Sequence, residues 1–262
     1  MTYEFFARTD CGRVRNNNED AVAFDRDARL AILADGMGGY NAGEVASAMA
    51  TTFIRTEMAR WLAQAGKNAP VADVRRALEI CVENANHAVL GASLSNPLYA
   101  GMGTTLVVGI FRDTRLILGH IGDSRCYRLR GGVLQQITRD HSWLQEQVDA
   151  GFLTPQQAAA SGSRNLVTRA LGVEPHVQME VNEFQVAPDD LFLMCSDGLT
   201  DMVSDADLAE MVRAPLPLED KATLLIDTAN AYGGRDNISV LLAHMAAGGK
   251  KRGFMSRLIR AA

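Results

Sequence analysis

Residues 30–39, Leu-Ala-Ile-Leu-Ala-Asp-Gly-Met-Gly-Gly, change abruptly from five apolar residues to a carboxylate followed by glycines. The apolar run predicts a buried strand, and we expect Asp35 where that strand leaves the sheet. An ionised carboxylate in such a place is costly unless it is paired or binds a metal. Taken alone, an ordinary Asp-Gly turn explains the stretch more simply. The interpretation therefore depends on whether the pattern recurs.

The pattern of an apolar run next to an aspartate occurs four times in the chain. The aspartates concerned are Asp35, Asp123, Asp197 and Asp236. If the four apolar runs are strands of one layered core, their ends can converge on one site. Converging carboxylates repel one another unless cations hold them. Oxygen ligands alone favour magnesium or manganese over zinc.

Composition restricts the class of protein. The chain has 262 residues, of which 47% are apolar and 22% charged, as expected for one large layered domain. The net charge of -5 argues against nucleic acid as the main partner. No apolar stretch is long enough for a membrane span, and the N-terminus does not resemble a signal peptide. Four widely separated cysteines without a C-x-x-C motif favour a reducing compartment, so we expect a cytoplasmic protein.

The order of the expected elements predicts an α+β fold. Helices are expected from Asn41, as the capping residue, to Leu62, and over Val71–Leu90. Several strands joined by tight turns follow, which indicates antiparallel sheet with segregated helices. The insertion after Trp143 has few large apolar residues and is typical of a mobile lid. The basic segment 248–262 is expected to be a loosely docked tail.

Arg15 lies in a polar stretch, Gly12–Asp20, that is rich in Asn and Asp. One interpretation is a polar turn in which Arg15 makes an exposed ion pair. The other is that Arg15 grips a phosphate, because the guanidinium fork matches phosphate oxygens. The residues alone leave both alternatives open.

Seven short motifs occur in an order that resembles the metal-dependent serine/threonine protein phosphatases, the PPM or 2C-type family, in their short bacterial form. The resemblance covers residues 1 to about 247. The motifs are G-x-V-R-x-x-N-E-D at 12–20, A-D-G-M-G-G at 34–39, G-M-G-T-T at 101–105, G-D-S-R at 122–125, D-H-S at 140–142, S-D-G-L at 196–199 and G-x-D-N at 234–237.

The resemblance implies a four-layer α-β-β-α sandwich of two antiparallel sheets flanked by helix pairs. It implies a catalytic domain over 1–247, with a flap at about 143–165 that faces the substrate, followed by the tail 248–262. It also implies two Mn²⁺ or Mg²⁺ ions, with a third in some members. Their bridging water would attack phosphoserine or phosphothreonine on a protein.

Matching positions carry the implied roles. Asp35 resembles the carboxylate that bridges two metals, and the Gly36 carbonyl binds one of them. Asp197 and Asp236 resemble the other ligands of this pair. Asp123, together with Asp197, resembles a third metal site.

Two further positions match the family outside the metal ligands. Arg15 resembles the arginine that binds the substrate phosphate, and Asp20 resembles a carboxylate that holds metal-bound water. Met37 stands where some relatives have a histidine acid, so that acid is excluded here. His141 is the one histidine in a family motif, and we expect its role to be structural.

The implied partners are phosphorylated proteins, including a bacterial serine/threonine kinase or its targets, in a signalling or secretion-control pathway. We expect a monomer. A non-catalytic binding module on the same fold is one alternative, although it predicts loss of the carboxylates, which are all present. A nucleotide-binding loop is another, but G-x-G-x-x-G starting at Gly36 requires glycine where Asn41 stands. A thiol phosphatase is disfavoured because no C-x5-R motif occurs.

Overall fold

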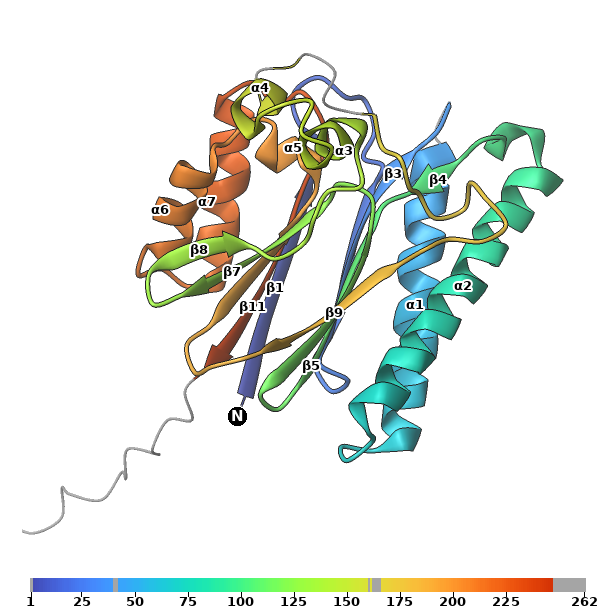
Figure 1. The fold of residues 1–262 in the computed structure, drawn as a ribbon, viewed down its shortest axis with the longest axis horizontal. Helices are drawn as coiled ribbons and strands as arrows, with labels where there is room; N and C mark the ends of the chain where they lie inside the picture. The colour runs from blue at the N-terminus through green and yellow to red at the C-terminus, as the bar shows by residue number, and fades with distance from the viewer. Residues whose placement is uncertain (1, 40–41, 160, 162–165, 247–262) are drawn as a thin grey trace, which may run out of the picture.

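Two antiparallel sheets lie face to face, and helices cover the outer face of each sheet (Figure 1). The computed structural model describes residues 2–39, 42–159, 161 and 166–246. Its layers run helix, sheet, sheet, helix, which confirms the α+β sandwich that the motifs predict.

The first sheet brings the two ends of the described chain together. Its strands, in spatial order, are β1 (Thr2–Asp10), β11 (Ile238–Ala246), β10 (Leu191–Cys195), β7 (Arg125–Arg130) and β8 (Val133–Gln136). All neighbouring strands are antiparallel. The strand pair β1 and β11 joins residues that are more than two hundred positions apart in the sequence, with Thr2 opposite Ala246.

The second sheet contains the stretch with which the sequence analysis began. Its strands, in spatial order, are β2 (Asp20–Asp25), β3 (Leu30–Met37), β5 (Leu106–Arg112), β6 (Arg115–Ile121) and β9 (Glu180–Gln185), and the short strand β4 (Gly103–Thr104) pairs with β3. Leu30 and Ile32 face the helices, whereas Ala31 and Leu33 face the other sheet. The run is apolar throughout because β3 is buried on both faces.

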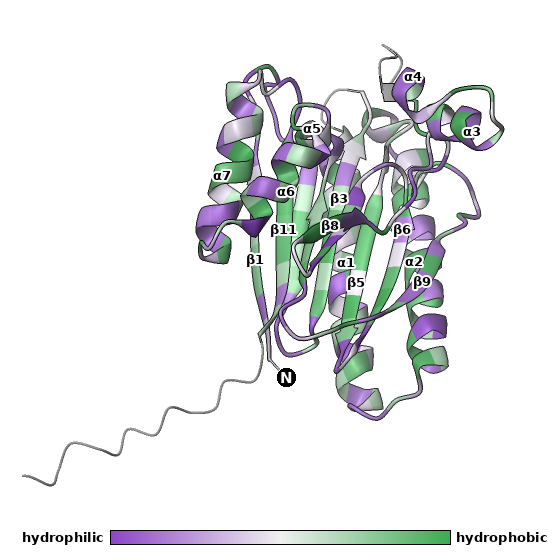
Figure 2. Ribbon diagram, turned by 60° about the vertical axis from the view of Figure 1, so that its left-hand side comes forward, coloured by the Kyte–Doolittle hydropathy of each residue, from purple (hydrophilic) through white to green (hydrophobic). Residues whose placement is uncertain are grey.

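The helices divide between the two outer faces (Figure 1). The second sheet is covered by α1 (Ala42–Ala65) and α2 (Val71–Ser95), and the first by α5 (Asp197–Thr200), α6 (Asp205–Arg213) and α7 (Leu218–Ala231). Shorter helices are η1 (Pro97–Tyr99), α3 (Trp143–Asp149) and α4 (Pro155–Ala159). Apolar residues concentrate along the central strands and on the inward faces of the helices (Figure 2). Among the described residues, none of the helices combines the length and the apolar character needed to cross a bilayer.

Two expectations about element bounds are corrected by the structure, and two others concern residues outside the described part of the chain. Asp35 lies inside β3, not at its end, because Gly36 and Met37 continue the strand by pairing with β4. Helix α2 runs to Ser95, five residues beyond the expected end at Leu90. The expected capping residue Asn41 and the tail 248–262 lie outside the described residues.

Candidate metal and phosphate site

The predicted carboxylates come from both sheets and from the loop that joins them. Asp20 and Asp35 stand directly opposite each other in the pairing of β2 with β3. Asp197 is the first residue of α5 and is separated from the end of β10 by Ser196 alone, and Asp236 lies two residues before β11. Asp123 lies in the turn between β6 and β7. The site therefore forms only where the two sheets are packed together.

Burial and mutual repulsion raise the pKa values of these carboxyl groups. The pKa of Asp35 lies well above its usual range, first because the group is buried, then because Asp20, Asp197, Asp123 and Asp236 are close. The pKa of Asp197 is raised in the same way, by burial and by its acidic neighbours. Such a cluster is unfavourable at neutral pH unless cations compensate the charge.

Asp20 and Asp123 complete the acidic cluster. Burial raises the pKa of each of these carboxyl groups to about 6. Asp20 Oδ2 accepts a hydrogen bond of 2.8 Å from Ser196 Oγ. Asp20 Oδ1 is buried and receives no hydrogen bond from any described residue. A buried acceptor of this kind needs a partner, so an all-oxygen site for hard divalent cations fits these side chains.

Arg15 places a positive charge beside Asp236 of the cluster. Its NH2 group lies 2.7 Å from Asp236 Oδ2, so the predicted ion pair is present. Half of the Arg15 side chain is exposed, which leaves guanidinium surface accessible to a ligand from solvent. The phosphate-binding role of Arg15 stays a prediction, and the ion pair is compatible with it.

Asn237 fastens the loop that carries Arg15 to the start of β11. Its Oδ1 accepts a 2.8 Å hydrogen bond from Glu19 N. Its Nδ2 donates to Cys11 O at 3.0 Å and to Asn17 O at 2.8 Å. One amide side chain thereby holds both sides of the Arg15 loop, a contact that the sequence analysis did not identify.

Two motif glycines are required by close approach of backbone to backbone. A Cβ atom on Gly36 would lie 2.1 Å from Gly43 O, where β3 meets the beginning of α1. A Cβ atom on Gly198 would lie 2.0 Å from Asn237 O, where α5 meets the loop before β11. Both distances are too short for any side chain, so these glycines fix the elements that carry the carboxylates.

The sequence analysis missed two further acidic residues near the site. The pKa of Asp197 is also raised by Asp201, which lies one helical turn further along the chain. The pKa of Asp123 is raised, after burial, chiefly by Asp140. Asp140 is held by Arg125, whose Nε and NH2 groups donate hydrogen bonds of 3.0 and 2.7 Å. Asp201 could have been found from the sequence, because residues four positions apart, such as Asp197 and Asp201, lie on the same face of a helix.

His141 braces the turn that carries Asp123. Its Nδ1 accepts a 3.1 Å hydrogen bond from Gly122 N, and its own backbone N donates to Gly122 O at 2.9 Å. Burial, followed by the nearby His120, lowers the pKa of His141 to about 4, so the ring is neutral at physiological pH. These contacts support a structural role.

The buried cysteines are poor nucleophiles. Cys81, Cys126 and Cys195 are free and buried. Burial raises the pKa of Cys81 and of Cys195 to about 12. These thiols therefore stay protonated at neutral pH, which agrees with the expectation that thiol chemistry is disfavoured.

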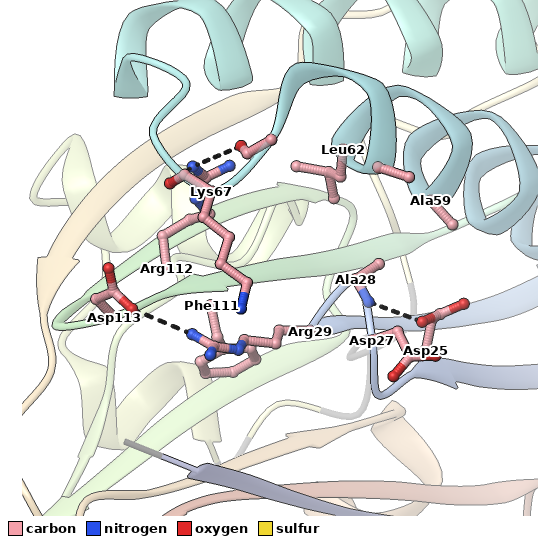
Figure 3. A pocket seen from close by; sticks show the side chains of 12 residues that line it. Asp25, Asp27, Ala28, Arg29, Ala59, Leu62, Lys67, Phe111, Arg112 and Asp113 are labelled. Carbon is pink, nitrogen blue, oxygen red and sulfur yellow. Dashed lines mark hydrogen bonds and ion pairs between the residues drawn. The ribbon is translucent and has the colours of Figure 1, made fainter.

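A cavity of about 390 Å³ lies at the opposite ends of β2 and β3 (Figure 3). Arg29 and Arg112 line it, but both are engaged: Arg29 NH1 lies 3.3 Å from Asp113 Oδ1, and Arg112 NH2 donates to Gly66 O at 3.2 Å. This cavity is separate from the acidic cluster, because it adjoins the hairpin that follows Asp25.

Comparison with known proteins identifies the family. A model described as protein phosphatase 2C matches residues 9–242. The serine/threonine phosphatase stp of Listeria innocua is 37% identical over 242 residues, which are 90% of this chain and 93% of that protein.

Two solved structures are similar over nearly the whole chain. The catalytic domain of the phosphatase PstP in complex with two manganese ions has a TM-score of 0.81 and 38% identity, covering 94% of this chain and 99% of that one. PppA of Pseudomonas aeruginosa, described as a key regulatory component of T6SS, has a TM-score of 0.81 and 32% identity, covering 93% and 97%. The chain therefore belongs to the protein phosphatase 2C family, which confirms the family and the enzyme class that its motifs predict.

Proposed function

We propose that the chain hydrolyses phosphoserine and phosphothreonine on proteins, with two Mn²⁺ or Mg²⁺ ions held by Asp35, Asp197, Asp236 and the Gly36 carbonyl. The names of its relatives, which include serine/threonine phosphatases, support this substrate class. The two manganese ions bound by the related PstP domain support the metals.

The observation that carries the proposal is the convergence of buried carboxylates from both sheets, each raising the pKa of its neighbours. Protein interiors rarely hold such repulsion unless cations offset it. When bound, a pair of divalent ions would activate a water for in-line attack on phosphorus and offset charge on the phosphoryl oxygens.

The residues of the chain itself have separate tasks in this proposal. Arg15 binds the phosphoryl group of the substrate, because its guanidinium is half exposed beside the cluster. Asp20 accepts a hydrogen bond from water at the site through its free Oδ1. Asp123 and Asp197 together offer a third cation position. Met37 has no proton to donate, so no side chain at that position protonates the leaving group.

We propose the remaining organisation on the same basis. Residues 1–247 form the catalytic domain, a flap at about 143–165 faces the phosphoprotein, and 248–262 is a tail. The enzyme acts as a cytoplasmic monomer and reverses a bacterial serine/threonine kinase in signalling or secretion control. The secretion assignment is supported only by the description of PppA.

The experiment that tests this function is phosphate release from a phosphothreonine peptide, measured with Mn²⁺ and then with excess chelator. We expect release that needs manganese, stops on chelation and resumes when manganese is restored. Asp236→Asn is the matched variant, because it keeps the size of the side chain but removes its charge. Folded wild-type protein that releases no phosphate under either condition would favour a binding module instead.

A further inference from the structure

A second group of metal-binding side chains lies on the outer face of α2, apart from the acidic cluster. Glu83 and His87 are one turn apart on this helix, and His176 lies in the segment before β9. The donor atoms of the three side chains all lie within 4.8 Å of one another. The structure already brings together residues that are about ninety positions apart in the sequence.

Two of the three distances between donor atoms are close to those around a tetrahedral zinc ion. His176 Nδ1 lies 2.9 Å from Glu83 Oε1, and His87 Nε2 lies 3.5 Å from the same oxygen. Ligand atoms about 2.0–2.1 Å from zinc at tetrahedral angles are separated by about 3.3 Å. Small rotations of exposed side chains are therefore sufficient to form the site.

The backbone that carries His176 is fixed to α2 before any metal binds. The buried side chain of Asn86 donates to Glu174 O at 2.8 Å and to Pro175 O at 3.2 Å. Its Oδ1 accepts a 2.7 Å hydrogen bond from Gly172 N. Because Asn86 holds the segment that carries His176, less conformational entropy is lost when an ion binds.

The protonation states suit a metal. The hydrogen bond that His176 Nδ1 donates lowers the pKa of Glu83, so this carboxylate is ionised at neutral pH. A neutral His176 ring can carry this proton on Nε2 instead, which frees Nδ1 for coordination. His87 Nε2 lies 3.0 Å from Pro175 O, and a neutral imidazole can move its proton to Nδ1 and free Nε2 for coordination. The side chains of His87 and His176 are 53% and 87% exposed, which leaves the fourth coordination position to water.

We propose that Glu83, His87 and His176 form a surface site for Zn²⁺ that links α2 to the segment preceding β9. Two imidazoles and one carboxylate favour zinc over magnesium and over manganese. The acidic cluster, built from oxygen atoms alone, has the opposite preference.

A third group, His120, His141 and Glu180, also has donor atoms close together but does not suit a metal. His141 Nδ1 accepts the hydrogen bond from Gly122 N, so Nε2 of the neutral ring carries the proton. That Nε2 is the atom that lies 3.6 Å from Glu180. The Gly122 N–H group fixes this tautomer from within the fold, so the proton on Nε2 of His141 cannot move to Nδ1, as it can in the exposed rings of His87 and His176.

The test is calorimetric titration of the whole chain with ZnCl₂ in the presence of excess Mg²⁺, which saturates the oxygen ligands. We expect one zinc ion per chain. His87→Gln and His176→Gln should each weaken zinc binding at least as much as the roughly 10–100-fold lost when only an outer partner of a ligand is removed. His244→Gln, on β11, is the matched control and should bind zinc as the wild type does.

Two further measurements separate this site from the catalytic one. Zinc should raise the Tm of the wild type and of Asp35→Asn, but not of the His87→Gln, His176→Gln double variant. Co²⁺ substitution should give absorption bands that the double variant lacks. Equal zinc affinity in the wild type and both histidine variants would overturn the proposal, as would zinc binding that Asp35→Asn abolishes. Because the readouts are binding and Tm, they do not depend on phosphatase activity.

Discussion

Replacing Asn237 by alanine tests whether one amide side chain positions the arginine loop. The change removes the hydrogen bond from Glu19 N and the two hydrogen bonds donated to Cys11 O and Asn17 O. The carboxylates themselves are untouched. The variant therefore separates support of the site from metal ligation.

The expected cost follows from these three hydrogen bonds. Each one contributes about 1 kcal/mol net to stability, so the free energy of unfolding should fall by about 3 kcal/mol. This lies within the usual stability of a domain, roughly 5–15 kcal/mol, so the variant should still fold. A displacement of Arg15 by about 1 Å should lower kcat/KM by roughly 10- to 100-fold.

Urea denaturation and phosphopeptide hydrolysis measure the two effects. Asn96→Ala is the matched control, because its side chain accepts one hydrogen bond, from Leu98 N, at the surface. That control should cost about 1 kcal/mol and leave kcat/KM unchanged. A stability loss in Asn237→Ala no greater than in the control, with unchanged kcat/KM, would refute the reasoning.

Three other predictions concern the carboxylates and a close contact between elements. Manganese-dependent phosphate release should be nearly abolished in each of the variants Asp35→Ala, Asp197→Ala and Asp236→Ala. Asp123→Ala should slow turnover but retain the metal pair. Wild-type rates in Asp236→Ala at ordinary metal concentration would contradict the ligand assignment. Burial and Asp140 raise the pKa of Asp123 from 3.8 to about 6, so the folded metal-free chain loses stability as the pH rises through that value. Asp123→Asn should therefore stabilise the metal-free chain above about pH 6 and give no gain below about pH 4 in urea melts; a gain independent of pH would show another cause. A Cβ atom at Gly198 would lie 2.0 Å from the backbone oxygen of Asn237. Gly198→Ala should therefore lower the free energy of unfolding by about 1–3 kcal/mol or more. An unchanged Tm would show that the loop before β11 moves freely.

The elements of the fold were predictable where burial leaves a regular pattern. The run Leu30–Ala34 is buried on both faces of its sheet, so it was recognisable as a strand from its composition alone. The end of that strand was not predictable, because Gly36 and Met37 are strand residues only through their pairing with β4. Local propensity carries no information about such a distant partner.

In the candidate site, too, some residues could be predicted from the sequence and others only from the fold. Asp35 and Asp197 were identifiable because each follows an apolar run. That Asp20 stands directly opposite Asp35 depends on the register of two strands, which is visible only in the fold. Asn237 and Asp140 stand in two of the quoted motifs, but their roles depend on contacts between segments that the motifs do not specify.

The origin of the carboxylates in two different sheets also has a consequence for how the enzyme matures. Asp20 and Asp35 belong to one half of the sandwich, whereas Asp197 and Asp236 border the other, about 160 to 220 residues later in the chain. Contacts of such long range form late and slowly during folding. Neither half alone contains all of the proposed ligands, so on this proposal a nascent or truncated chain should stay inactive until its last strand has docked. Appearance of metal-dependent activity during refolding would therefore report completion of the fold.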